Sequence, residues 1–205
     1  MYHVTFRGTH REAGLRRGRF LASHGNFILQ NAPFPVTQAR LQFAQQCVPI
    51  YRRFFPAVLQ EIEGLAEGQG CAPQALQAIL FSMYAMPPAS CCSCFAVSNG
   101  AQVFLARNSD FLLALQHWNG NVIYRLDGRC FHFTGNTTAF VEIEDGVNEH
   151  GLAAGLTSVS PGRIQPGLNA GMLLRLMLET CRTVEQALAL ARRVPIASAQ
   201  TLTLA

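Results

Sequence analysis

Residues 91–111, CCSCFAVSNGAQVFLARNSDF, carry the strongest structural signal in this sequence. It reads as two short buried strands around a turn at residues 98–100, where Asn and Gly accept the positive φ of a hairpin. Cysteines begin the first strand, and Arg107 and Asp110 end the second. We therefore expect the thiol of Cys92 to face a carboxylate and a guanidinium across the hairpin, which makes this a candidate site.

The composition indicates one globular domain over residues 1–205. Hydrophobic residues make up 49% of the chain and charged residues 14%, enough to bury a core. The net charge of +4 comes from scattered arginines, so we expect no nucleic-acid partner. The absence of lysine excludes a Schiff-base lysine within this chain.

Cysteine usage and the N-terminus suggest a cellular location. The seven cysteines are an odd number, and three of them crowd into residues 91–94, so a complete disulfide framework is not expected. Neither a secretory signal nor a membrane-spanning segment is recognisable. We therefore expect a cytoplasmic protein with no membrane partner.

The first part of the chain is expected to be helical after a short strand over residues 1–8. Capping residues and prolines mark the helix starts. Pro49 is expected to interrupt one helix, and the prolines at 87–88 to end the last. The expected helix starts are Thr9, Thr37, Pro56 and Pro73.

Strands follow the hairpin, and helices return near the end. The resulting order of helices, antiparallel strands and helices predicts an α+β fold with helices covering a sheet. The strands are expected at residues 122–125, 130–133, 139–143, 152–157 and 201–205, and the helices at 172–178 and 184–190.

The Cys92 thiol needs a base, because the thiolate is the reactive form. No histidine lies in the hairpin, so a Cys/His pair would need His117, His132 or His150. Another route is cleavage before Cys92, which frees an α-amino group with a pKa of about 8 that can serve as the base. Asp110 would orient that amine, and Arg107 would hold the carboxylate or a substrate anion.

These residues resemble the N-terminal-nucleophile (Ntn) hydrolases of the acyl-coenzyme A:6-aminopenicillanic acid acyltransferase family, to which the choloylglycine hydrolases are more distant. Cys92, Arg107 and Asp110 fall on the family's nucleophile and its Arg-Asn-x-Asp motif. Cys94 stands where the family often has Thr or Ser, and Cys91 stands where Gly commonly precedes the scissile bond. Residues 8–18, GTHREAGLRRG, and residues 146–157, GVNEHGLAAGLT, are similar to two further family segments.

The resemblance implies a four-layer αββα sandwich. It implies a helical segment over residues 1–91, separated by self-cleavage from a β segment that begins at residue 92. Relatives are longer and carry further active-site residues downstream, so we expect residues 92–205 to be the start of that segment, with its C-terminal part missing.

The resemblance also implies an enzyme: an amide hydrolase or acyltransferase that forms a thioester on Cys92. Catalytic candidates are Cys92, Asp110, Arg107, Cys94 and Thr157, the last as the nearest match to an oxyanion donor. No cofactor or metal is implied. The expected partner is a small-molecule amide or acyl donor, of a class the sequence leaves open, and a homodimer is compatible with the pattern.

Three alternatives remain open at this point. The crowded cysteines can be small hydrophobes of a buried strand. They can bind zinc together with His132 or His150, although the spacing is unusual. The chain can also be a non-catalytic or unprocessed protein that keeps the fold, and a cut before Cys91 would move the nucleophile by one residue.

Overall fold

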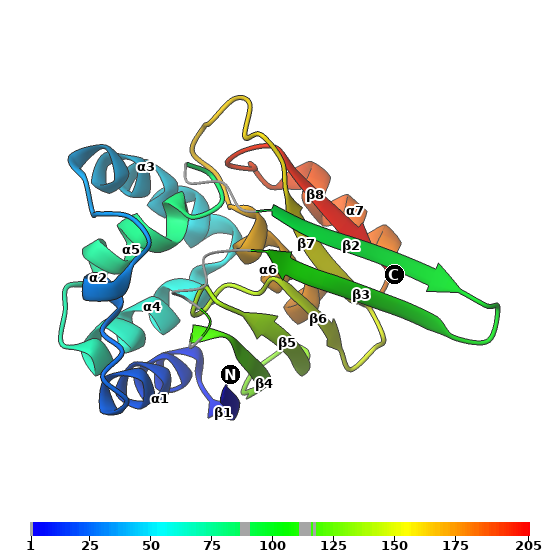
Figure 1. The fold of residues 1–205 in the computed structure, drawn as a ribbon, viewed down its shortest axis with the longest axis horizontal. Helices are drawn as coiled ribbons and strands as arrows, with labels where there is room; N and C mark the ends of the chain where they lie inside the picture. Colours follow the sequence, from blue (N-terminus) through cyan, green and yellow to red (C-terminus); the bar gives the residue numbers. More distant parts are fainter. Residues whose placement is uncertain (1, 87–90, 111–115, 117) are drawn as a thin grey trace.

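The computed structural model describes residues 2–86, 91–110, 116 and 118–205, with Cys91 described by its backbone alone. The helices and strands run in two blocks, a helical one and a β-rich one (Figure 1). In chain order they are β1 (Tyr2–Gly8), α1 (His10–Ser23), α2 (Ile28–Asn31), α3 (Gln38–Phe54), α4 (Pro56–Gln69), α5 (Pro73–Ser82), β2 (Cys91–Ser98), β3 (Val103–Asp110), β4 (Gly120–Leu126), β5 (Phe133–Thr137), β6 (Asp145–Asn148), β7 (Ala153–Ser158), α6 (Ala170–Thr180), α7 (Val184–Arg193) and β8 (Gln200–Leu204).

Two sheets form the β-rich block. The larger has six strands in the order β1-β4-β5-β6-β7-β8, of which β1 and β4 are parallel and the other neighbours antiparallel. The hairpin β2-β3 is a separate two-stranded sheet that crosses the larger one and contacts β7 and β8 (Figure 1). Helices pack on the opposite face, with α6 against β6 and β7. The α+β prediction is confirmed, and the layers correspond to α, β and β of an αββα sandwich.

Helices α1 and α4 pack at backbone distance because glycines face one another. A Cβ at Gly14 would lie 1.9 Å from the carbonyl oxygen of Glu61, and one at Gly64 would lie 2.0 Å from that of Arg11. Thr9 and Glu12 form the expected capping box at the start of α1. The spacing of Gly14 and Gly18 in this segment is therefore a helix-packing requirement, because a Cβ at Gly18 would also lie 2.5 Å from the carbonyl oxygen of Leu65.

The prediction that Pro49 interrupts a helix is wrong. Helix α3 continues through this proline, which removes one backbone hydrogen bond. Its neighbours Cys47 and Tyr51 are fully buried, so side-chain packing on both sides outweighs that loss. Helix α5 ends at Ser82, and residues 87–88, which were expected to end it, lie outside the described residues.

Two predicted strands differ in the structure. The strand expected at 130–133 is β5, which begins at Phe133. The strand expected at 139–143 is instead a turn-containing segment in which every residue from Ala139 to Glu144 is buried and Phe140 has φ 60°. A half-exposed strand would alternate, whereas this segment is enclosed on all sides, and the next strand starts only at Asp145.

A buried polar network joins the helices to the large sheet. Arg175 forms ion pairs with Glu61 of α4 and Glu179 of its own helix, and Glu179 also contacts His10 at 3.1 Å. Arg17 donates a 2.7 Å hydrogen bond to the hydroxyl of Tyr124 on β4. Each charged group thus has a partner of opposite charge or a hydroxyl, as burial requires. None of the helices among the described residues combines the length and the hydropathy that a membrane span requires.

Candidate functional site

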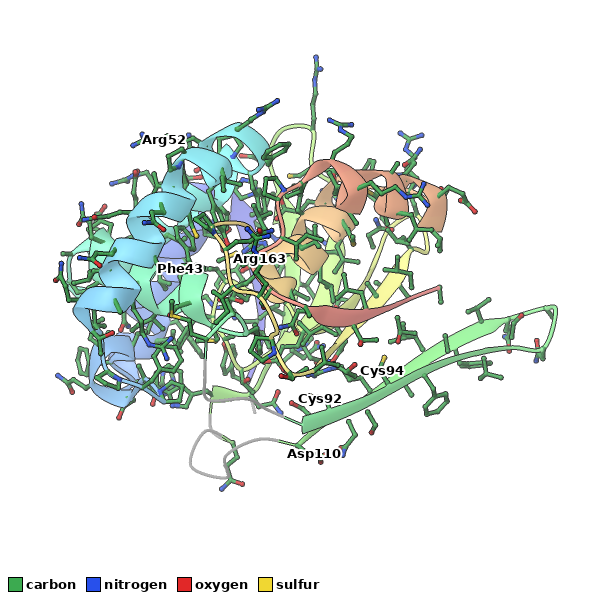
Figure 2. The ribbon with its side chains drawn as sticks, turned by 90° about the horizontal axis from the view of Figure 1, so that it is seen from above. Phe43, Arg52, Cys92, Cys94, Asp110 and Arg163 are labelled. Atoms are coloured by element: carbon green, nitrogen blue, oxygen red, sulfur yellow. The ribbon has the colours of Figure 1, made fainter. Side chains whose placement is uncertain are left out.

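The register of the hairpin determines which side chains share a face. Cys92 pairs with Ser109, and Cys94 pairs with Arg107. Residues directly opposite each other in an antiparallel pair point to the same side, and alternate residues share it. Figure 2 shows Cys92 and Cys94 on the side of the hairpin that faces the large sheet, and Asp110 on the outer side.

Arg107 is the centre of the inner face. Its Nη2 lies 3.0 Å from the Sγ of Cys92, its Nε donates to the carbonyl oxygen of Leu156 at 2.6 Å, and its side chain is 4% exposed. Nη1 lies 3.1 Å from Glu144 Oε2 and 3.4 Å from Asp145 Oδ2. Burial alone would lower the pKa of Arg107, but the negative groups around it, Glu144 first, raise it. The guanidinium is therefore a fixed positive charge beside the thiol.

Glu144 forms an ion pair with this arginine and also accepts hydrogen bonds from other residues. Its Oε1 accepts a 2.7 Å hydrogen bond from the hydroxyl of Tyr84, and others from the backbone N–H and the hydroxyl of Thr138. Asp145 accepts a 2.6 Å hydrogen bond from Asn136. Burial raises the pKa of Asp145, while Asn136 and Arg107 oppose that effect.

Cys94 lies where the hairpin comes closest to the large sheet. A Cβ at Gly155 of β7 would be 2.7 Å from the Sγ of Cys94 and 3.3 Å from a methyl carbon of Leu105. Only glycine allows this approach without displacing a neighbour. Thr157 is two residues further along β7, so it belongs to the same face of the strand as Gly155.

The expected facing of Cys92 and the Asp110 carboxylate is wrong. Asp110 pairs with Cys91 rather than Cys92, and a shift of one residue places a side chain on the other face. The Asp110 carboxylate is exposed and accepts a 2.6 Å hydrogen bond from Asn108. The backbone of Asp110 nevertheless lies opposite Cys91, the residue on the N-terminal side of the expected cleavage site.

The expectation that the hairpin strands are buried is also wrong for their outer half. Phe95 is 60% exposed and Phe104 is 55% exposed, and the turn projects past the strands of the large sheet (Figure 1). Large exposed hydrophobic side chains gather on this hairpin: Phe95, Val97, Val103 and Phe104.

The other proposed partners of the thiol are placed as follows. His132 Nδ1 lies 3.5 Å from Glu149 Oε2, and the ring of His150 packs edge-on against Phe131. His117 lies outside the described residues. Among the residues that the structure describes, no group of three His, Cys, Asp or Glu side chains could hold a metal ion.

A hollow of about 390 Å³ lies between the hairpin and strands β4 to β7. Asn121 donates to Asn136, which donates to Asp145, and these three side chains form a polar row along it. Leu105 and Val103 line it from the hairpin. The row ends at Asp145, which contacts Arg107, so the hollow adjoins the group beside the thiol.

Sequence reasoning missed Glu144, Asp145 and Tyr84. The strand expected at residues 139–143 ended just before Glu144, and the sequence analysis gave this glutamate no role, whereas its side chain is buried at 3% exposure. The available signal was three acids in four positions among apolar neighbours, residues 142–145, because buried acids cluster where an arginine must be neutralised.

Comparison with known proteins agrees with the motifs. The family model "Acyl-coenzyme A:6-aminopenicillanic acid acyl-transferase" matches residues 97–205, and the chain belongs to this family. A solved structure of penicillin V acylase from Agrobacterium tumefaciens is similar at 24% identity and a TM-score of 0.33. That match covers 37% of this chain and 26% of the acylase chain. No curated protein matches this chain.

Proposed function

We propose that this chain acts as a cysteine-type Ntn amide hydrolase or acyltransferase, with Cys92 as the nucleophile. The observation that carries the proposal is the 3.0 Å contact between Cys92 Sγ and Arg107 Nη2, in an arginine fixed by Glu144 and Asp145. The guanidinium lies within hydrogen-bond distance of the sulfur, the atom that would attack a carbonyl carbon.

Activation would begin with cleavage of the chain. The Cys92 thiol attacks the carbonyl carbon of Cys91 and loses its proton, the C–N bond breaks, and the Cys92 nitrogen takes up a proton to become an amine. Water then hydrolyses the thioester and leaves a carboxylate on Cys91 and a free thiol on Cys92. The new α-amino group has a pKa of about 8 and can accept a proton from the adjacent thiol.

Asp110 and Thr157 would assist from two sides. The register of Asp110, opposite Cys91, supports a role in orienting the amine that cleavage creates, although its carboxylate does not face the thiol. Thr157 shares the face of β7 that lies under the hairpin, but its backbone N–H points within the sheet toward its ladder partner Thr201 on β8, so its side chain is the group that would assist. Catalysis would then pass an acyl group from an amide to Cys92 and on to water or an amine.

The first test is the mass of the purified chain. We expect wild type to give two fragments, the second beginning at Cys92, and Cys92→Ala to stay whole. Cys130→Ala, which changes a half-buried thiol after β4, should cleave as wild type does. A second fragment beginning at Cys91 would assign the nucleophile to Cys91, and normal cleavage of Cys92→Ala would refute the proposal.

The second test separates hydrolysis from transfer. The processed protein is incubated with an acyl-coenzyme A, with and without 6-aminopenicillanic acid, the two compounds in the name of the family. Transfer gives an N-acyl product and coenzyme A, whereas hydrolysis gives the free acid in both samples. A chain that neither cleaves nor becomes acylated on Cys92 would be the non-catalytic alternative.

A further inference from the structure

Tyr84 lies seven residues before Cys91 and is held in an unusual conformation. Its φ is 58°, a left-handed value that a bulky residue adopts only when its surroundings enforce it. Its carbonyl oxygen accepts hydrogen bonds from Gln200 at 2.6 Å and from Ser198 at 3.1 Å. Its ring lies against Gly171 of α6, where an added Cβ would be 3.2 Å away.

The hydroxyl of Tyr84 leads directly to the thiol site. It donates to Glu144 Oε1, the other oxygen of that carboxylate contacts Arg107, and the same guanidinium contacts Cys92. Burial, and then the neighbouring Glu144, raise the pKa of Tyr84 well above its ordinary value, so the phenol remains a donor. Four side chains from four segments therefore form one continuous chain of contacts.

We propose that Tyr84 is a positioning residue for the cleavage step, acting through Glu144 and Arg107 on Cys92. The inference rests on the proposed function and adds a coupling to it. Among the described residues, Tyr84 connects the segment upstream of the scissile bond to the guanidinium through its hydrogen bond to Glu144. Correct placement of Tyr84 thus orients Arg107 beside the Cys92 sulfur. The sulfur is therefore ready to attack the Cys91 carbonyl when the segment upstream of the scissile bond is in place.

The coupling is tested with Tyr84→Phe, Glu144→Gln and the double variant. Tyr84→Phe removes only the hydroxyl, and we expect cleavage to slow about ten-fold, the usual effect of losing a hydrogen bond to a charged group. Glu144→Gln should slow it about 100-fold. Because both changes break one chain of contacts, the double variant should cleave no more slowly than Glu144→Gln alone.

The matched control is Tyr51→Phe, a change at a fully buried tyrosine on α3. It should cleave at the wild-type rate even if it lowers the thermal stability, so a merely structural effect is separated from the coupling. Wild-type cleavage in Tyr84→Phe would overturn the proposal. Effects that multiply in the double variant would also overturn it, because the two residues would then act independently.

A second readout does not depend on cleavage. The rate at which iodoacetamide labels Cys92, relative to Cys71 of the helical block, reports the reactivity of the sulfur beside Arg107. We expect Tyr84→Phe and Glu144→Gln to slow Cys92 labelling several-fold, without a further loss in the double variant. If wild type is never cleaved, the proposed function fails while this measurement still decides the coupling, and unchanged labelling refutes it.

Discussion

Glu142 lies at 0% exposure in the segment before β6, beside the first turn of α6. Burial raises its pKa well above the ordinary 4.5, Asn169 opposes that shift, and Glu144 adds to it. The group is therefore favoured in its neutral form in the folded chain. A raised pKa means stability that is fully present below pH 4.5 and is lost as the pH rises through the folded-state value.

Glu142→Gln should remove this loss, because glutamine has the shape of the protonated acid and never ionises. We expect the variant to melt about 3 °C above wild type at pH 8 and at the same temperature at pH 4. Thermal unfolding followed by circular dichroism at both pH values is the measurement. A variant that is less stable than wild type at pH 8 would show that the carboxylate is needed in its charged form.

Single residues differed in how well the sequence predicted them. Cys92 and Arg107 were predicted as site residues, because a thiol and an arginine near the ends of a hairpin are visible in the sequence. Asp110 was predicted on the wrong face, since the register depends on how many residues the turn takes up. Glu144 was not predicted at all, because its partners Tyr84 and Arg107 come from distant parts of the chain.

At the scale of elements, the approach of the hairpin to β7 depends on Gly155. We expect Gly155→Ala to cost roughly 1–2 kcal/mol of unfolding free energy, because the new methyl meets Cys94 Sγ and Leu105. Combining it with Cys94→Ala removes the nearer obstacle and should restore about half of the loss. Urea unfolding measures both. If the double variant loses the sum of the single effects, the contact is not the cause.

The predicted elements were correct where local signals decide and wrong where tertiary packing does. The caps at Thr9 and Thr37 and the proline at the start of α4 mark helix starts that the structure confirms. The segment 139–143 has the alternation of a strand, yet it is enclosed by neighbours that the sequence does not reveal. Pro49 was misread for the same reason, because buried side chains on both sides keep α3 continuous.

For the molecule as a whole, the network around Arg175 joins the helical block to the sheet. Burial would raise the pKa of Glu179, but Arg175 and His10 outweigh it and lower the pKa. A lowered pKa contributes stability that is present above pH 4.5 and is lost as the pH falls through the folded-state value. Acid should therefore loosen the contact between the two blocks.

We expect Glu179→Gln to cost about 3 kcal/mol at pH 7, because it leaves Arg175 with one carboxylate fewer in a buried site. The difference from wild type should shrink as the pH falls below 4.5 and through the folded-state pKa of Glu179, because the native carboxylate then loses its charge too. Glu67→Gln, at a half-exposed ion pair with Arg11, is the control and should change stability by less than about 1 kcal/mol. A constant difference across this pH range would exclude the linkage.

The β2-β3 hairpin also affects the tendency of the protein to self-associate in solution. Its projecting half, residues 95–106, contains no charged residue, and among the described residues each of its two strands has one long side without a strand neighbour. Hairpins of this kind associate through their unpaired strand edges and apolar side chains, since they carry no charges that would repel a second hairpin. Solutions of the protein should accordingly be kept dilute and cold. Turbidity that develops on concentration is expected to arise from association through this hairpin rather than from unfolding of the rest of the chain.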